Sequence, residues 1–110
     1  MFGPYVDREA VDHYVRTLSG PGALTAALNW YRAATSDLDE TPPVRVPTTY
    51  VWSTDDPALG SAAAERCGEF VDAEYEFVVL PGVSHWIPEE APEAAADAIR
   101  HRVGTAGIGP

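Results

Sequence analysis

Apolar residues in the first part of the chain recur at a helical period. From Val6 to Leu18 they stand every four residues, which predicts a helix over this range. The segment Ser19-Gly20-Pro21-Gly22 ends that helix, and a second one is expected from Ala23 to Ala34. Residues 37–43 are polar, acidic and contain proline, so we expect a linker or a long surface loop there.

The pattern changes after this acidic segment. Residues 46–52 are rich in β-branched and aromatic side chains without strict alternation, which is typical of a strand buried on both faces. The next expected elements are a helix over 61–70, a strand over 75–80, a loop to Pro88 and a helix over 92–103. This alternation predicts a parallel sheet. Because parallel sheets are covered on both faces and usually have more strands, we expect part of a larger assembly or a chain that needs a partner.

The composition is that of a globular protein with a strongly acidic charge. Hydrophobic residues make up 45% of the 110 residues and charged residues 22%. The chain has 17 acidic and 7 basic side chains, and its formal net charge is −10. All seven basic residues are arginine. Nucleic acids and anionic membranes repel such a chain, which excludes both as main partners.

The cysteine count and the hydropathy of the chain indicate the compartment in which we expect the protein. The single cysteine, Cys67, excludes an internal disulfide and a cysteine-based zinc site. No apolar run reaches the roughly 18 residues that a membrane-spanning helix needs, and the N-terminus lacks a signal-peptide pattern. We therefore expect a cytoplasmic protein.

The two loops that follow the expected strands carry the candidate catalytic residues. The first loop contains Asp55 and Asp56, and the second contains His85. If the strands are parallel, both loops lie at the same edge of the sheet, where functional groups of such sheets gather. An aspartate there could accept a hydrogen bond from one imidazole nitrogen, while the other nitrogen takes a proton from a nucleophile or a water. The acid precedes the histidine, as it does in the α/β-hydrolases.

Several segments carry a family resemblance. They are VWSTDDPALG at 51–60, GVSHWIP at 82–88, EAPE at 90–93 and ALNWYR at 27–32. The first resembles the acid-bearing loop of α/β-hydrolases of the epoxide-hydrolase-like group. The next two resemble the histidine loop of that group and the helix after it, and the last resembles the end of its cap region. Together they extend over most of residues 6–103.

The resemblance implies a role for individual residues. It makes His85 the base and Asp56 the acid, with Asp55 as the competing acid one residue away. Tyr31 matches the cap tyrosine that donates a hydrogen bond to the epoxide oxygen, a role that suits a neutral phenol. We expect neither a cofactor nor a metal. The acidic residues Asp37, Asp39 and Glu40 are interpreted as solvated loop residues rather than metal ligands.

The resemblance also implies the fold and the domain organisation. The expected fold class is α/β: the C-terminal part of an α/β-hydrolase, with two parallel strands and flanking helices, preceded by the last helices of a cap region. Residues 1–43 would form the end of the cap and a linker, 44–103 the strand–helix–strand–helix segment of the hydrolase domain, and 104–110 a tail.

The nucleophile of the family is missing from this pattern. No G-x-[SD]-x-G sequence, which marks the nucleophile elbow, occurs in the chain. We therefore expect a hydrolase fragment that carries the acid and base but is inactive alone. Should it turn over substrate, Ser53 and Ser84 would be the first candidate nucleophiles.

Several alternatives stay open at this point. The parent nucleophile could be Asp or Ser, and the substrate a small apolar epoxide or ester; the parent could also be a dehalogenase. A second hypothesis is a non-catalytic truncated product, or a fragment that associates with another chain. Exposed strand edges would also allow the chain to associate with itself.

Overall fold

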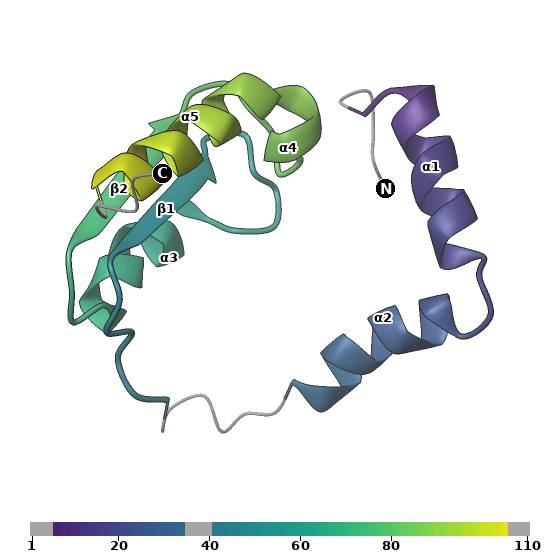
Figure 1. Cartoon of the computed structure of the whole chain (residues 1–110), viewed down its shortest axis with the longest axis horizontal. Coiled ribbons are helices and arrows are strands. Elements are labelled where there is room, and N and C mark those ends of the chain that lie inside the picture. Colours follow the sequence, from purple (N-terminus) through teal and green to yellow (C-terminus); the bar gives the residue numbers. More distant parts are fainter. Residues whose placement is uncertain (1–5, 35–40, 106–110) are drawn as a thin grey trace. The chain divides into compact units, whose positions relative to one another are not determined.

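The chain forms two compact units, Met1–Thr41 and Pro42–Pro110, in a computed structural model that describes residues 6–34 and 41–105. Figure 1 shows both units coloured along the sequence. The expected linker falls partly outside the described residues, at 37–40, and so do residues 106–110 of the expected tail. No helix within the described ranges combines the length and apolar character that crossing a membrane requires.

The first unit contains the two expected helices, α1 (Arg8–Leu18) and α2 (Ala23–Ala33). Helix α1 begins two residues later than the periodicity predicted because Asp7 caps it: the Asp7 carboxylate accepts a hydrogen bond from the Ala10 N–H at 2.8 Å. Gly22 precedes α2 with a φ of 77°, a left-handed conformation that glycine adopts without strain. Neither helix contains a fully buried residue.

The second unit is built on a parallel pair of strands, β1 (Thr48–Ser53) and β2 (Tyr75–Leu80). The register pairs Thr48 with Tyr75 and Ser53 with Leu80, so the two strands end together. The predicted parallel arrangement is confirmed, and the bounds of β2 are those predicted. Strand β1 starts two residues later than expected, after Pro47, which has no N–H to contribute to a ladder.

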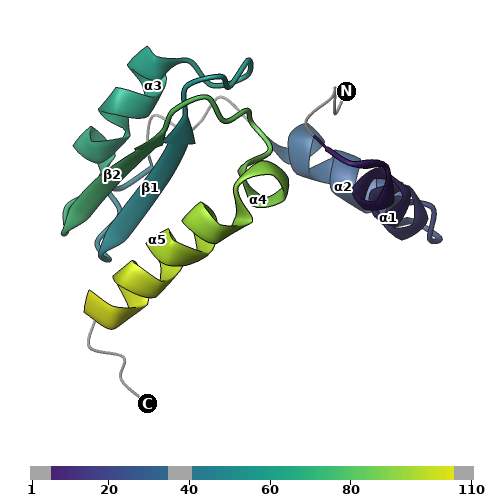
Figure 2. The same cartoon turned by 90° about the horizontal axis from the view of Figure 1, so that it is seen from above.

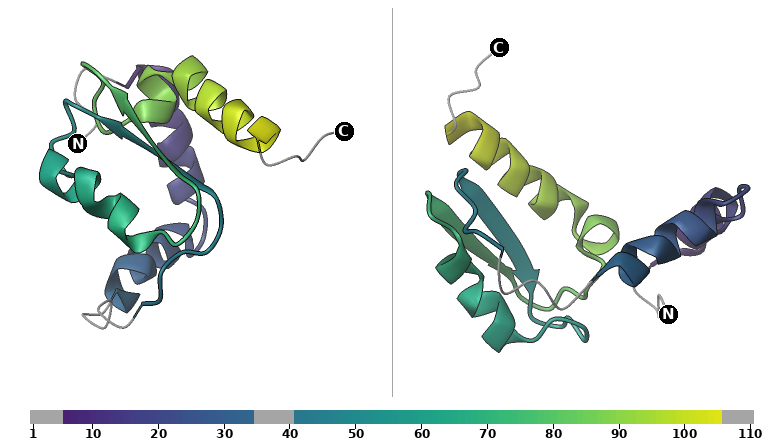
Figure 3. Two further views of the ribbon diagram at one scale, coloured as in Figure 1. Left: turned by 90° about the vertical axis from the view of Figure 1, so that its left-hand side faces the viewer. Right: turned by 90° about the horizontal axis from the view of Figure 1, so that it is seen from below.

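Helices cover both faces of this strand pair. Helix α3 (Ser61–Arg66), with its 3₁₀ continuation η3 (Cys67–Phe70), lies on one face, and α5 (Pro92–Thr105) lies on the other (Figures 2 and 3). A short helix, α4 (Ile87–Glu90), precedes α5, so the expected loop to Pro88 is wrong at its end. Proline fits there because the first helical turn needs no N–H from it. Helix α5 runs to Thr105, beyond the expected end at 103.

Aromatic side chains fill the space between the strands and α3. The rings of Tyr50 and Phe77 stack with centroids 5.6 Å apart, and Trp52 lies 6.5 Å from Phe77. The Trp52 indole donates to the Leu59 carbonyl at 2.8 Å, which joins the core to the loop after β1. Burial, the largest influence, raises the pKa of Tyr50, so this phenol stays neutral at pH 7. The aromatic layer thus ties β1 and its following loop together.

On the opposite face an arginine fastens α5 to the starts of the strands. The Arg102 guanidinium donates to the Thr49 hydroxyl at 2.7 Å and to the Glu74 carboxylate at 2.8 Å, and its side chain is only 15% exposed. The bond to Thr49 is partly buried, and its charged donor makes it stronger than a bond between neutral groups. These bonds lie at the end of the sheet where the strands begin. The two loops with the candidate residues lie at the other end, where β1 and β2 finish.

Gly68→Ala is expected to destabilise the chain by about 1–3 kcal/mol. A Cβ at this position would lie 2.8 Å from Cε1 and 3.0 Å from Cδ1 of the Tyr75 ring, which is half-buried beneath η3. The matched control is Gly104→Ala in α5, where a Cβ would meet nothing within 4 Å. Alanine should stabilise the helix there by up to about 1 kcal/mol. Urea melts that give both variants the same change in unfolding free energy would contradict the prediction.

Candidate functional site

The loops after β1 and β2 are joined by backbone hydrogen bonds at the carboxyl end of the strand pair. The Thr54 N–H donates to the Leu80 carbonyl and the Asp55 N–H to the Val83 carbonyl, both at 3.1 Å. The Gly82 N–H donates to the Thr54 hydroxyl at 2.8 Å. Because these bonds prolong the pairing of β1 and β2, both loops are placed at one edge of the sheet, as the sequence predicted.

At this edge the structure brings Asp56 and His85 together. The distance from His85 Nδ1 to Asp56 Oδ2 is 2.8 Å. The Asp56 side chain is 5% exposed, whereas that of His85 is 39% exposed. With Nδ1–H as the donor, the imidazole carries its lone pair on Nε2. The Trp86 ring meets the imidazole edge-on, with centroids 5.4 Å apart and the planes at 85°.

The second oxygen of Asp56 is also occupied. Asp56 Oδ1 accepts the N–H groups of Ala58 and Leu59, at 2.7 and 2.9 Å. Burial is the largest single influence on this carboxyl and would raise its pKa. The hydrogen bonds from His85, Leu59 and Ala58, with the attraction of the imidazolium, outweigh burial together and hold the pKa of Asp56 below its ordinary value. Asp56 is therefore an oriented, ionised carboxylate at neutral pH.

The competing acid, Asp55, does not make this contact. Its carboxylate accepts a hydrogen bond from the neighbouring Thr54 hydroxyl at 3.0 Å, and the residue is exposed. The family resemblance made Asp56 the acid and left Asp55 as its competitor. The geometry favours Asp56.

The other candidates from the sequence are a tyrosine of the first unit, two buried serines and three acidic residues. Tyr31 belongs to α2 in the first unit and is 77% exposed. Ser53 and Ser84 are 0% and 2% exposed, and the Ser53 hydroxyl is used in a bond to the Ser84 carbonyl at 2.7 Å. Neither serine presents a hydroxyl to solvent, so neither is placed to attack a substrate. Asp37, Asp39 and Glu40 lie outside the described residues.

Sequence reasoning missed one residue of the site. Glu90 of α4 accepts the backbone N–H of Ser84, the residue before His85, at 3.0 Å. In the sequence Glu90 is only part of the EAPE segment that resembles the helix after the histidine loop. A carboxylate six residues after Ser84 gives no local signal of this bond, because the short helix α4 creates it by turning the chain back on the loop.

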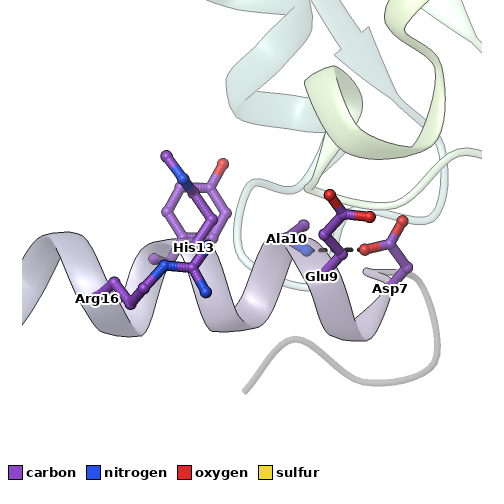
Figure 4. Close-up of a pocket in the computed structure, with 6 residues that line it drawn as sticks. Asp7, Glu9, Ala10, His13 and Arg16 are labelled. Carbon is purple, nitrogen blue, oxygen red and sulfur yellow. Dashed lines mark hydrogen bonds between the residues drawn. The ribbon is translucent and has the colours of Figure 1, made fainter.

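Two further features of the described residues bear on other kinds of site: a surface hollow and the absence of a metal-ligand cluster. Within residues 6–34 and 41–105, no group of three His, Cys, Asp or Glu side chains could hold a metal ion. A surface hollow of about 330 Å³ is found on α1 (Figure 4). The residues drawn around it, including Glu9, His13 and Arg16, come from that helix and its cap. None of them belongs to the Asp56–His85 pair.

Comparison with known proteins gives a consistent set of relatives. The chain is 30% identical over 101 residues to Epoxide hydrolase A of Mycobacterium tuberculosis, covering 86% of this chain and 31% of that protein. It is 30% identical over 96 residues to Epoxide hydrolase 3 of Xenopus tropicalis, covering 86% and 26%. It is 35% identical over 86 residues to the AB hydrolase superfamily protein YfhM of Bacillus subtilis, covering 76% and 30%. The chain thus spans about a third or less of each of these relatives.

A solved structure agrees with these sequences. It was described among novel epoxide hydrolases of the α/β-hydrolase superfamily in metagenomes from hot environments. Its TM-score to this chain is 0.68 at 28% sequence identity, and the match covers 89% of this chain and 38% of the other. No protein-family model matches the sequence.

Proposed function

The chain belongs to the α/β-hydrolase superfamily, in its epoxide-hydrolase-like branch, and from this premise we propose that Asp56 and His85 are the acid and base of a hydrolytic site. One observation carries the proposal: the ionised, largely buried carboxylate of Asp56 lies 2.8 Å from Nδ1 of the half-exposed His85. That is the acid–base half of a catalytic triad.

The geometry divides the work between the two side chains. Asp56 accepts the Nδ1–H bond, which fixes the tautomer of His85 and leaves Nε2 as the proton acceptor. When Nε2 takes a proton from an attacking water, the imidazolium forms beside the carboxylate and is stabilised by it. The low pKa of Asp56 keeps the proton on His85 rather than on the acid. The pair thus activates water or another nucleophile.

The proposal also includes a substrate class and a third residue, Tyr31. We infer a small apolar epoxide because the relatives with matching segments are named epoxide hydrolases; esters and haloalkanes are the alternatives. The exposed Tyr31 phenol is proposed to donate to the epoxide oxygen, where a neutral O–H stabilises the alkoxide as the ring opens. The nucleophile is not assigned, since the chain contains no G-x-[SD]-x-G sequence.

A chimera tests this function directly. The chain would replace the matching segment of the Mycobacterium tuberculosis Epoxide hydrolase A, and the purified product would be assayed with styrene oxide, phenyl acetate and 1-bromobutane. We expect styrene oxide to be hydrolysed fastest by the chimera and none of the three by the 110-residue chain alone. A folded chimera that turns over no substrate would overturn the proposal, whereas turnover by the lone chain would overturn only the expectation that it is inactive alone.

A second function, association with another polypeptide, is favoured by the surface of the second unit. In the described part of the chain, β1 and β2 pair only with each other, so each strand has an edge without a partner. Beside the free edge of β1, a hollow of about 180 Å³ opens between β1 and α5. Ile99 and Val103 at this hollow are 64% and 43% exposed. Parallel sheets are normally covered at such places.

We therefore expect the chain alone to self-associate through this surface. Sedimentation velocity should show a species heavier than 11.8 kDa that grows with protein concentration. Added salt should favour it, because the net charge of −10 repels copies of the chain from one another and salt screens that repulsion. Ile99→Glu should weaken association, whereas Val15→Glu on α1, at a site 57% exposed, should not. A monomer at all concentrations that melts above about 60 °C would contradict the prediction.

A further inference from the structure

The residue before the histidine is held at three of its atoms. The Ser84 N–H donates to the Glu90 carboxylate at 3.0 Å, and the Ser84 carbonyl accepts the Ser53 hydroxyl at 2.7 Å. The Ser84 hydroxyl accepts the Trp86 N–H at 3.3 Å. We call Ser53, Ser84 and Glu90 the Ser84 anchor. It fixes the backbone on which the His85 side chain is mounted.

One bond of this anchor is buried and the other is partly buried. Ser53 is 0% exposed and Ser84 is 2% exposed, so water does not compete for the bond between them. Glu90 is half-buried, and its bond to the Ser84 N–H is a charge-assisted one, roughly twice as strong as a neutral bond. A buried network with all partners present is rigid. The anchor therefore restricts where His85 can lie.

Ser53 also determines the position of the other partner of the pair. It is the last residue of β1, and its carbonyl accepts the Asp56 N–H at 3.3 Å. The hydroxyl of the same residue holds Ser84. One residue at the end of the strand thus sets both Asp56 and the backbone next to His85, and the 2.8 Å contact between the two side chains depends on both placements.

We propose that Ser53 and Glu90 are positioning residues, which hold His85 so that its Nδ1–H meets Asp56 and its Nε2 stays the proton acceptor. The role of these residues in catalysis rests on the proposed function above. Their effect on the tautomer of His85 does not depend on that function. The alternative is that both residues merely satisfy buried backbone groups. In that case they would affect stability and leave the imidazole unchanged.

Long-range ¹H–¹⁵N spectra of the histidine side chains in the intact chain distinguish these cases. In the native chain at pH 8, we expect the Nδ1–H tautomer of His85 to predominate, and Asp56→Ala to abolish this preference. Ser53→Ala and Glu90→Ala should each reduce the Nδ1–H fraction towards that of Asp56→Ala. Glu90→Gln keeps an acceptor oxygen and should preserve most of it. The exposed His13 and His101 are internal references whose signals should not move.

A matched substitution controls for the loss of a hydroxyl. Ser19 also donates to a backbone carbonyl at 2.7 Å, that of Val15 at the end of α1, and Ser19→Ala should leave His85 unchanged. If Ser53→Ala does not fold, the comparison of Glu90→Ala with Glu90→Gln decides. Folded Ser53→Ala and Glu90→Ala chains with the native tautomer fraction would overturn the proposal.

The chimera separates this inference from the proposed function. In an active chimera, Ser53→Ala should lower kcat at least tenfold while KM stays within twofold, since the buried Ser53 side chain is not accessible to a substrate. A chimera without activity, together with a tautomer that responds to Ser53→Ala, would reject the hydrolytic function and leave the anchor standing. If Ser53→Ala leaves the tautomer of His85 unchanged, the positioning role of the anchor is rejected, whatever the activity of the chimera.

Discussion

His85→Ala is expected to lower kcat/KM for styrene oxide in the chimera by a factor on the order of 10⁴. The imidazole Nε2 is the proposed proton acceptor, and Asp56 cannot replace it because a carboxylate is a weaker base than an imidazole and one Asp56 oxygen still accepts the N–H groups of Ala58 and Leu59. Initial rates over a range of substrate concentrations measure the loss, with circular dichroism to confirm that the variant is folded. The loss should appear in kcat, because a base acts in the transition state.

The control for this prediction is another histidine of the same unit. His101→Ala removes an imidazole that is 62% exposed and lies 3.8 Å from Glu76, at the end of the sheet away from Asp56. It should change kcat/KM less than twofold. If both substitutions have equal effects, or if His85→Ala costs less than about tenfold, His85 is not the base.

Asp56→Ala is expected to lower the unfolding free energy by about 2–4 kcal/mol at pH 7. The substitution removes three bonds to one sheltered carboxylate and leaves the N–H groups of Ala58 and Leu59 without this acceptor. Asp56→Asn should cost less, because an amide oxygen can still accept those two bonds. Urea melts of the three proteins at pH 7 measure both losses.

The same substitution should lose its effect in acid. The folded-state pKa of Asp56 lies below its ordinary, unfolded value, so at mildly acid pH the unfolded chain binds more protons than the folded one. The stability from this carboxylate is therefore fully present above about pH 5 and is lost as the pH falls through the folded pKa. The native chain and Asp56→Ala should therefore converge in stability as the pH falls below the ordinary pKa of an aspartate, by about the amount that ionised Asp56 contributes.

Asp55→Asn is the matched control for this pH dependence. It removes a carboxylate next to Asp56 in sequence that is exposed and does not bond His85. Its stability should run parallel to that of the native chain from pH 7 to pH 3. A gap between native and Asp56→Ala chains that stays constant or widens in acid would show that the carboxylate is not held ionised by its bonds.

The sequence by itself determined the main elements and the edge of the sheet at which the site lies. Helical periodicity located α1 and α2 to within two residues, the run of β-branched and aromatic residues located β1 to within two residues, and the bounds predicted for β2 are those observed. The order strand–helix–strand–helix required parallel strands, and parallel strands place the loops after them at one edge. The proximity of the aspartates to His85 follows from local patterns and this topological rule alone.

Tertiary structure decided which aspartate meets the histidine and what holds it there. Asp55 and Asp56 are neighbours of the same type, and only the course of the loop after Ser53 turns Asp56 inward to a partner 29 residues away. The hydrogen bond from the Ser84 N–H to Glu90 likewise needs the turn made by α4, and the 3₁₀ turn of η3 brings Gly68 against Tyr75. Periodicity shows which side of an element is apolar. Hydrogen bonds between distant residues depend on register and loop conformation, which are set only when the strands pair and the helices pack.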